Sequence, residues 1–496
     1  MKGVRSLRPR LASFKGSAMV VAYPAGWLAT HVPHHDVLVL GGGSAGCVLA
    51  GRLSEDEGRS VCLVEAGPDY GAHADGGWPE ELLDPGGIPE THEWNPDESW
   101  FTPLRAKVMG GCSSHNACLL VWGTAEDYDA WGSGWTFAEL EPHLRRAERA
   151  IAPRPRVYGS DELSPWFEGI VAAGEEVGLP VLEDFNDPAA LEGIGLGPFN
   201  IQDGVRWNAS FAYVDPARAR PNLTVLPETL VDRVVVEGGR VRAVATDRGE
   251  LTADTIVLAA GAYGSPAILL RSGIGPEDHL RRLGIDVVEA SDAVGAHLLD
   301  HPSVKLTFDG NATLQDETAR AAPVPFTNGA IKARTDGCEE GTWDVHLLPV
   351  VSRTGERAHL TVVALQPRSA GSVRLASADP AVSPRIDHGF LAEPEDTELL
   401  LGGLAVAHRL AATEPLRRLG RVADMDDRER VRSTLAAIFH PCGTCALGAV
   451  VDRDLRVHGV ENLYVGDASV MPSIPRANTH LTVLGVAEKL AATLSA

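Results

Sequence analysis

The sequence predicts an α/β protein that opens with a strand, a glycine-rich turn, a helix and a second strand of the doubly wound type. Residues 36–40 form a short apolar run that suits a buried parallel strand, and residues 60–64 form another. Between them, residues 44–53 carry apolar side chains at helical spacing. A chain of 496 residues exceeds one ordinary compact domain, so we expect two interlocked domains.

The composition is that of an acidic globular protein. Asp and Glu number 67 against 44 Lys and Arg, which gives a formal net charge of −23. Such a chain repels phosphate backbones, so nucleic acid is not an expected partner. Seven cysteines, an odd number in a long chain, do not form the pattern of a disulfide scaffold and favour a reducing compartment. We therefore expect a cytoplasmic protein.

Residues 1–34 stand apart from the rest of the sequence. Basic side chains without any acid precede a mostly apolar run at residues 18–29, which is the order found in signal peptides. Pro24 and Gly26 interrupt that run, and no stretch of the chain reaches the length of a membrane-spanning helix. We expect a disordered extension or a misplaced start codon, with export as the alternative, and we predict no transmembrane segment.

The first turn matches the G-x-G-x-x-G fingerprint of dinucleotide sites. Gly41 permits the tight turn, Gly43 lets the backbone approach a pyrophosphate, and Gly46 allows close helix–strand packing. The following helix then directs its free N–H groups at the phosphates. Glu65 ends the second strand 19 residues after Gly46, where its carboxylate can accept hydrogen bonds from a ribose diol. A plain glycine turn would not carry all these elements in order, so the sequence predicts a dinucleotide site.

Two later segments favour FAD over NAD. Residues 255–260 form another apolar strand that ends in Gly261, and residues 462–465 form one that ends in Gly466-Asp467-Ala468. A flavin dinucleotide is long and needs such a second contact distant in sequence, whereas an NAD domain usually closes within about 150 residues. Alone, the second segment would be a strand-terminating turn. Together with the N-terminal fingerprint it indicates FAD.

With these features in place, the sequence resembles the glucose–methanol–choline (GMC) family of FAD-dependent oxidoreductases over about residues 36–496. Several segments occur in the order of that family: residues 41–46 and 65–67, 107–116, 261–266 and 272–276, 294–301, 440–444 and 478–480. Residues 111–116 are most similar to the choline oxidase and choline dehydrogenase-like branch. The resemblance implies the cofactor FAD and the following binding residues: Gly41, Gly43, Ser44, Ala45, Gly46, Glu65, Ala66, Gly110, Gly111, Ser114, His115, Asn116, Ala117, Gly261, Asp467, Ala468, Asn478 and Thr479.

The fold that this resemblance implies is a doubly wound, Rossmann-like FAD-binding domain with an α+β substrate domain built on an antiparallel sheet. Both domains are then discontinuous. The FAD-binding domain takes residues 35–125, 205–300 and 435–496, and the substrate domain takes residues 126–204 and 301–434. Within the substrate domain, residues 361–375 are expected to form two strands of the sheet around a Pro-Arg-Ser-Ala-Gly turn.

The chemistry expected of the site is the oxidation of an alcohol. That reaction needs a base for the hydroxyl proton, and histidine is the side chain that supplies one near neutral pH. By resemblance, His440 is the catalytic base and His480 orients the hydroxyl or shares its proton. Cys442 and Cys445 form a C-x-x-C beside the base, but no second pair of ligands accompanies them, so we expect packing cysteines and no metal.

His115 raises the question of a covalent flavin. The resemblance to the choline-oxidase branch implies a bond from this side chain to the 8α methyl of the flavin, although other members carry His here without the bond. Choline itself is not the expected substrate, because a loose alignment places Thr327 where a carboxylate would meet the trimethylammonium. A neutral primary or secondary alcohol is expected instead.

Two alternatives stay open at this point: a flavin-dependent lyase or decarboxylase on the same fold, and a flavin-binding protein without turnover. The pair His440 and His480 favours oxidation over both. The sequence does not distinguish oxygen, a quinone or another carrier as the electron acceptor, and it does not indicate an oligomeric state.

Overall fold

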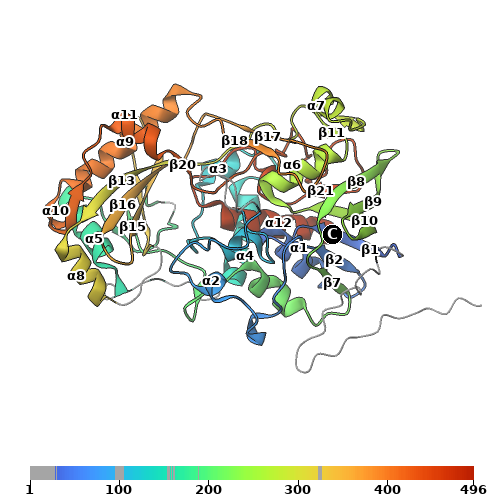
Figure 1. The fold of residues 1–496 in the computed structure, drawn as a ribbon, viewed down its shortest axis with the longest axis horizontal. Helices are drawn as coiled ribbons and strands as arrows, with labels where there is room; N and C mark the ends of the chain where they lie inside the picture. Colours follow the sequence, from blue (N-terminus) through green and yellow to red (C-terminus); the bar gives the residue numbers. More distant parts are fainter. Residues whose placement is uncertain are drawn as a thin grey trace, which may run out of the picture.

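The chain forms two sheets joined through a central helix (Figure 1). A mostly parallel sheet lies on the right of the view and an antiparallel sheet on the left, with α12 (Thr479–Ser495) between them. The computed structural model describes residues 28, 31–94, 105–152, 157, 159, 162–187, 189–321 and 327–496. Most of the extension predicted to be disordered therefore lies outside the described residues.

The strands predicted around the dinucleotide site are neighbours in one parallel sheet, because each is an apolar run whose two faces are buried. Its order is β7 (Leu223–Leu226), β2 (Val61–Val64), β1 (His34–Leu40), β10 (Gly249–Leu258) and β21 (Leu463–Val465). β10 is longer than its neighbours, and its first half continues antiparallel into β9 (Arg240–Thr246) and β8 (Val231–Glu237). The sheet thus joins three segments that are far apart in sequence.

Helix α1 (Ser44–Leu53), helix α12 and helix α4 (Phe137–Ile151) pack against one another beside this sheet. The approach of α12 to α4 is close enough that a Cβ at Gly485 would lie 2.5 Å from Leu144 Cδ2. Helix α3 (Ala125–Asp129) joins the same hydrophobic core through Tyr128. Residues 126–151, which the predicted boundary assigned to the substrate domain, therefore share the hydrophobic core of the parallel sheet.

The antiparallel sheet has the order β19 (Gly420–Val422), β13 (Pro302–Gly310), β16 (Arg357–Ala364), β15 (Val345–Val351), β14 (Ala330–Ala333), β4 (Gly193–Gly195) and β3 (Val181–Leu182), with β20 (Ala436–Ala437) also paired to β13. One face packs against α9 (Pro394–Ala411) and α5 (Pro165–Val177). Successive side chains point to opposite faces, so Val345 and Leu347 join that helical core while His346 lies on the other face.

The expectation of two adjacent strands in residues 361–375 is wrong in its second half. The first strand is β16, in the large sheet, but the second is β17 (Ser372–Arg374), which pairs with β18 (Arg385–Asp387) in a separate two-stranded sheet. The turn between them carries the chain away, because Gly371 pairs with Leu298. The two strands and the turn were predicted correctly, but the sheet of the second strand was not.

Shorter elements complete the fold: α2 (Glu80–Leu83), α6 (Gly261–Arg271), α7 (Glu277–Arg282), α8 (Ala312–Arg320), α10 (Glu414–Leu419), α11 (Asp427–Thr434), β5 (Ile201–Gln202), β6 (Val205–Arg206), β11 (Ile274–Gly275), β12 (Glu289–Ala290), η1 (His73–Asp75), η2 (Gly111–Ser114), η4 (Ser210–Val214), η5 (Asp215–Ala217) and η6 (Ala468–Val470).

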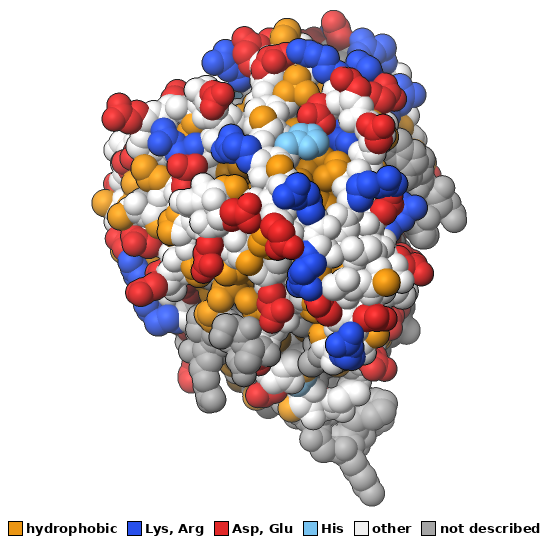
Figure 2. Space-filling view, turned by 90° about the vertical axis from the view of Figure 1, so that its left-hand side faces the viewer, with side chains coloured by type: hydrophobic (Ala, Val, Ile, Leu, Met, Phe, Trp, Pro, Cys, Tyr) orange, Lys and Arg blue, Asp and Glu red, His pale blue; other side chains and the backbone are white. Residues whose placement is uncertain are grey.

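At the end of the molecule seen in Figure 2, Lys and Arg side chains are interspersed with Asp and Glu side chains. None of the described helices is both long and apolar enough to cross a bilayer.

A buried carboxylate holds the three packed helices together. Glu488 on α12 is fully buried and accepts three hydrogen bonds of 2.8–3.0 Å from Arg52 of α1, and Arg146 of α4 lies 3.4 Å away. Glu488→Ala leaves Arg52 without its main partner, so we expect the free energy of unfolding in urea to fall by about 3 kcal/mol.

The matched control for this prediction is Glu55→Ala, which removes the other carboxylate that binds Arg52. Glu55 is exposed, so its loss is expected to cost less than about 1 kcal/mol. Equal losses for the two variants would contradict the assignment of Glu488 as the buried tie.

Candidate active site

The first glycine turn has the geometry expected of a dinucleotide cradle. Gly41 has φ +113°, and a Cβ there would lie 2.5 Å from the carbonyl oxygen of Ala259. A Cβ at Gly46 would lie 1.8 Å from the Gly41 oxygen, so both glycines are required by packing of the turn, the helix and β10. At Gly43, by contrast, the nearest atom to a Cβ would be Gly111 Cα at 3.9 Å. The protein's own packing does not demand that glycine, whereas a pyrophosphate approaching the backbone would.

Helix α1 begins at this turn with its backbone donors free. Gly43 is the N-cap residue and provides no side-chain cap, and the first turn, which contains Ser44 and Ala45, holds no acidic side chain. A helix N-terminus in this state favours an anionic group through its free N–H groups and its dipole.

Glu65 lies at the carboxyl end of β2, where it was predicted. Its carboxylate accepts hydrogen bonds from the N–H groups of Gly42 at 2.7 Å and Gly67 at 2.8 Å, and burial raises its pKa to about 7 in spite of them. A cavity of about 460 Å³ opens beside it, lined in part by Ala66, Gly67 and Leu230. A buried acid at the edge of a cavity, with lone pairs left to accept further hydrogen bonds, fits a ribose diol.

The second predicted segment faces the first. Gly110 and Gly111 have φ values of +87° and +53°, and a Cβ at Gly111 would lie 2.6 Å from Gly43 Cα. The Gly110 N–H also donates to the carbonyl of Gly42. The Ser114 hydroxyl donates to the Met109 carbonyl, and Asn116 Oδ1 accepts from the backbone N–H of Cys118, the residue after the predicted Asn116–Ala117 pair. The two glycine turns, which are far apart in sequence, therefore form one cradle.

His115 follows this segment, and the residue is buried, with a relative exposure of 6%. Neither ring nitrogen makes a hydrogen bond of normal geometry to a described residue. The backbone of Thr91 is nevertheless near enough to favour the protonated ring and so to raise the pKa of His115. Burial, with the nearby Arg206 guanidinium, lowers the pKa of His115 to about 4. The ring is neutral at pH 7, and its lone pair is not used by the described residues.

Asp467 connects the remaining predicted residues. Both of its carboxylate oxygens accept hydrogen bonds: one from the Gly261 N–H at 2.8 Å and the Ser265 hydroxyl at 2.5 Å, the other from the N–H and hydroxyl of Ser469. The side chain therefore fastens the end of β21, including Ala468, to the start of α6. Gly261 has φ +78° and no atom within 4 Å of where its Cβ would stand.

These residues fit FAD. The open space at Gly43, the uncapped α1 terminus, the buried Glu65 beside a cavity and the unpaired ring of His115 each correspond to a part of a flavin dinucleotide. The structure brings together four glycines and one acid, namely Gly41, Gly43, Gly110, Gly111 and Glu65. His115 follows Gly110 and Gly111 in the chain.

His440, the predicted base, lies where two segments distant in sequence meet. A two-way backbone pairing between Leu299 and Cys442 brings the chain segments of His440 and His301 together. Asp300 then binds the backbone N–H groups of both His301 and His440 through Oδ1, at 2.8 and 2.9 Å. The two imidazoles meet with their Nδ1 atoms 3.0 Å apart.

The contacts of this pair fix which nitrogen carries each proton. His301 Nε2 lies 3.1 Å from the Leu365 carbonyl, which can only accept, so this nitrogen carries the proton. Burial lowers the pKa of His301 to about 4, hence the ring is neutral and its Nδ1 accepts. His440 therefore donates from Nδ1, and its Nε2 accepts a hydrogen bond from the Asn478 amide at 3.2 Å. Burial also holds the pKa of His440 well below its ordinary value.

His480 stands in the first turn of α12, next to Thr479, with Asn478 as the N-cap residue. Its Nε2 is buried and unpaired, and burial lowers its pKa to about 4. Asn478, predicted as a cofactor contact, is the residue that binds His440 Nε2 in this structure. The role of His480 toward a hydroxyl group stays a prediction.

Sequence reasoning assigned no role to three residues that matter here. Asp300 and His301 were noted only as part of a resembling segment, and their contact with His440 depends on a tertiary pairing. Arg105 is the third: its Nε and Nη2 are buried without a partner, and its charge adds to the lowering of the His440 pKa. A lone arginine before a glycine turn gives no signal by which it could have been found.

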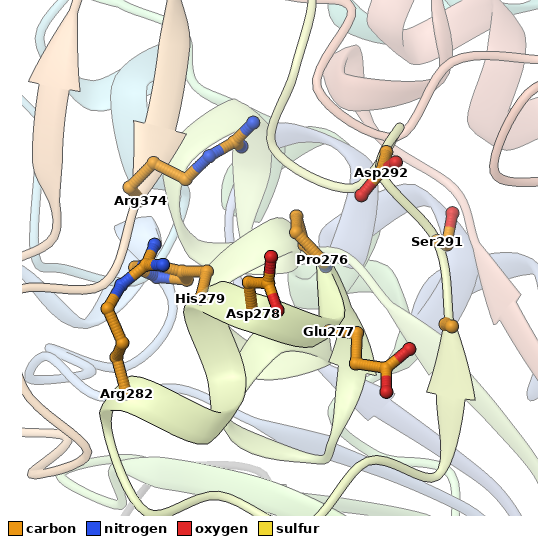
Figure 3. A pocket seen from close by; sticks show the side chains of 9 residues that line it. Pro276, Glu277, Asp278, His279, Arg282, Ser291, Asp292 and Arg374 are labelled. Carbon is orange, nitrogen blue, oxygen red and sulfur yellow. The ribbon is translucent and has the colours of Figure 1, made fainter.

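A second cavity, of about 610 Å³, does not belong to this site (Figure 3). It lies by α7, β12 and Arg374, and its lining mixes basic and acidic side chains. None of the predicted site residues lines it. Cys442 and Cys445 are free and buried in the core, and no cluster of metal-ligating side chains occurs in the described part of the chain.

Comparisons with family profiles and with individual relatives identify the same family. The GMC oxidoreductase profiles match residues 35–303 and 367–487. Choline oxidase from Arthrobacter globiformis is 32% identical, covering 92% of this chain and 93% of its own. The oxygen-dependent choline dehydrogenase of Brucella anthropi is also 32% identical, over 92% of this chain and 94% of its own.

Solved structures agree. Pyridoxine 4-oxidase from Mesorbium loti superposes with a TM-score of 0.81 at 27% identity, covering 93% of this chain and 99% of its own. Formate oxidase gives a TM-score of 0.80 at 26% identity, over 94% and 99% of the two chains. The chain therefore belongs to the GMC oxidoreductase family of FAD-dependent enzymes.

Proposed function

We propose that this protein oxidises the CH–OH group of a small alcohol to a carbonyl, with His440 as the base. The observation that carries this proposal is the neutral imidazole of His440, whose Nδ1 is committed to His301 and whose Nε2 is left as an acceptor. No lyase is among the relatives named above. Those relatives act as oxidases or dehydrogenases, and this supports oxidation over elimination.

The division of labour follows from the residues. FAD, when bound, accepts the hydride from the alcohol carbon. His440 Nε2 takes the hydroxyl proton, after which the ring carries a proton on both nitrogens. Asp300 Oδ1 holds the backbone N–H groups of both His301 and His440, so this side chain positions the two rings. His301 keeps Nδ1 of His440 occupied, so Nε2 is the nitrogen that accepts, and a substrate hydroxyl would replace the Asn478 amide there.

The experiment that tests the proposal is an alcohol panel run with two acceptors. Purified holoenzyme is mixed with primary and secondary alcohols in the presence of oxygen and, separately, of an artificial dye, and the carbonyl product is identified. Carbonyl formation with either acceptor supports the proposal and shows which acceptor serves. The absence of product from every alcohol with both acceptors would reject it.

Replacing the base gives a quantitative prediction. His440→Ala is expected to lower the rate of flavin reduction by about 10² to 10⁴, the usual contribution of a general base, with FAD content unchanged. Because the pKa of His440 is lowered, the neutral base is already present at pH 6.5, and the wild-type rate should stay level from there to pH 9. The rate is measured by anaerobic stopped-flow, and a wild-type rate in the variant would assign the base elsewhere.

His301 is expected to act as a positioning residue. His301→Ala removes the acceptor for His440 Nδ1, so the ring can turn or change tautomer, and flavin reduction should slow by about 10²-fold with little change in KM. His301→Gln restores an acceptor and should recover part of the loss. His408→Ala, which removes a histidine bound to Asp427 elsewhere, is the control. If KM rises instead and kcat stays constant, His301 serves substrate binding and not the tautomer.

We further propose that His115 is the attachment point of FAD, because its ring is buried and neutral and neither ring nitrogen has a hydrogen bond of normal geometry to a described residue. Acid-precipitated protein should stay yellow and exceed the sequence mass by one FAD, and His115→Ala should release its flavin into the acid supernatant. Complete release of flavin from the wild-type protein would refute the bond and leave the proposed oxidation intact.

A further inference from the structure

The face of the antiparallel sheet turned away from its helices carries two basic side chains. Lys332 of β14 and His346 of β15 are paired across the strands. Their neighbours Ile331 and Val345 join the core beneath the helices, so Lys332 and His346 point to the opposite face. Both are buried, with exposures of 1% and 3%.

The ammonium of Lys332 sits in an aromatic box. Its Nζ lies 4.0 Å from the ring centroid of Trp343 and 5.0 Å from that of Phe185, and it donates to the Ala190 carbonyl at 3.2 Å. No ion pair of Lys332 occurs among the described residues, and Asp184 and Asp187 attract it only from a greater distance. Aromatic faces around a cation are the usual recognition site for quaternary ammonium groups. Here the protein's own cation fills that box.

The box adjoins the catalytic histidines. The ring of His346 stacks on Trp343 and packs on Phe185, and it lies close enough to His440 to contribute to the lowering of the His440 pKa. Phe185 belongs to the same apolar cluster as Ala477, which immediately precedes Asn478. Lys332 therefore shares its aromatic neighbours with His346, a ring that contributes to the lowering of the His440 pKa.

We propose that Lys332 sets the charge selectivity of the site: the enzyme accepts uncharged alcohols and rejects quaternary ammonium alcohols such as choline. This inference rests on the proposed alcohol oxidation. The positive charge at Lys332 repels a second cation, and the aromatic surface that would have attracted that cation is already occupied. The relatives that act on choline would then differ from this chain at the substrate and not in the chemistry.

The test compares choline with its uncharged carbon isostere, a dimethylbutanol of the same shape. Each is used as a competitive inhibitor of the wild-type holoenzyme against the alcohol that reduces the flavin best. We expect choline to bind at least about tenfold more weakly than the isostere. Equal binding, tighter binding of choline, or no detectable binding of either would overturn the inference.

Two variants assign the selectivity to Lys332. Lys332→Met removes the charge while keeping the length of the side chain, and the choline-to-isostere ratio should move about tenfold toward choline. Lys305→Met, at an exposed lysine of the same sheet, should leave the ratio unchanged. An unchanged ratio in Lys332→Met would overturn the assignment.

A measurement on the unmodified enzyme covers the case in which Lys332→Met does not fold. Burial lowers the pKa of Lys332 to about 8. Burial also lowers the pKa values of the nearby histidines His301, His346, His440 and His480, so these rings are already neutral at pH 6.5. Of these five groups, only Lys332 therefore loses its charge when the pH is raised from 6.5 to 9.5. The charge of choline does not titrate. Its binding relative to the isostere should improve over this range, and a flat ratio would count against Lys332.

The outcomes separate this inference from the proposed function. If no alcohol reduces the flavin, the proposed oxidation has failed. The binding of choline and of its uncharged isostere is then compared through the change that each causes in the flavin absorbance. If alcohols are oxidised but choline is preferred, the oxidation stands and the role of Lys332 falls.

Discussion

The structure depends on the parallel pairing of β10 with β1 on one side and β21 on the other. Three segments far apart in sequence meet at the carboxyl ends of these strands, where the first glycine turn, Gly261 and Asp467 follow. Asp467 then binds the start of α6 through two hydrogen bonds, from Gly261 and Ser265, and accepts two more from Ser469 of η6, which fixes the loops against each other. Without this pairing the pyrophosphate cradle and the histidines would belong to unconnected parts of the chain.

The site is short of negative charge, and this controls its chemistry. His301, His440 and His480 are all kept neutral by burial, and Arg105 adds a cation near them. A neutral imidazole is a base that is ready at physiological pH. The same shortage, extended to Lys332, is unfavourable for a cationic substrate. Base strength and charge selectivity thus have a common electrostatic origin.

The sequence predicted those features that are local. The apolar strands at residues 36–40 and 60–64, the turn at Gly41 and the acid at Glu65 each follow from a few neighbouring residues, and the structure has them together. It did not predict the contact of His301 with His440, the box around Lys332 or the packing of α4 on α12, because these depend on which strands and helices become neighbours. Residues 372–374 show the same limit: their alternation predicted a strand, but not the sheet to which it belongs.

The most direct test of the account is the anaerobic titration of the oxidised holoenzyme with an uncharged alcohol. The account predicts that the flavin becomes fully reduced and that one carbonyl product forms for each flavin, because proton and hydride leave the same CH–OH group. A flavin that stays oxidised in excess alcohol, or carbonyl that forms while the flavin spectrum does not change, would contradict it.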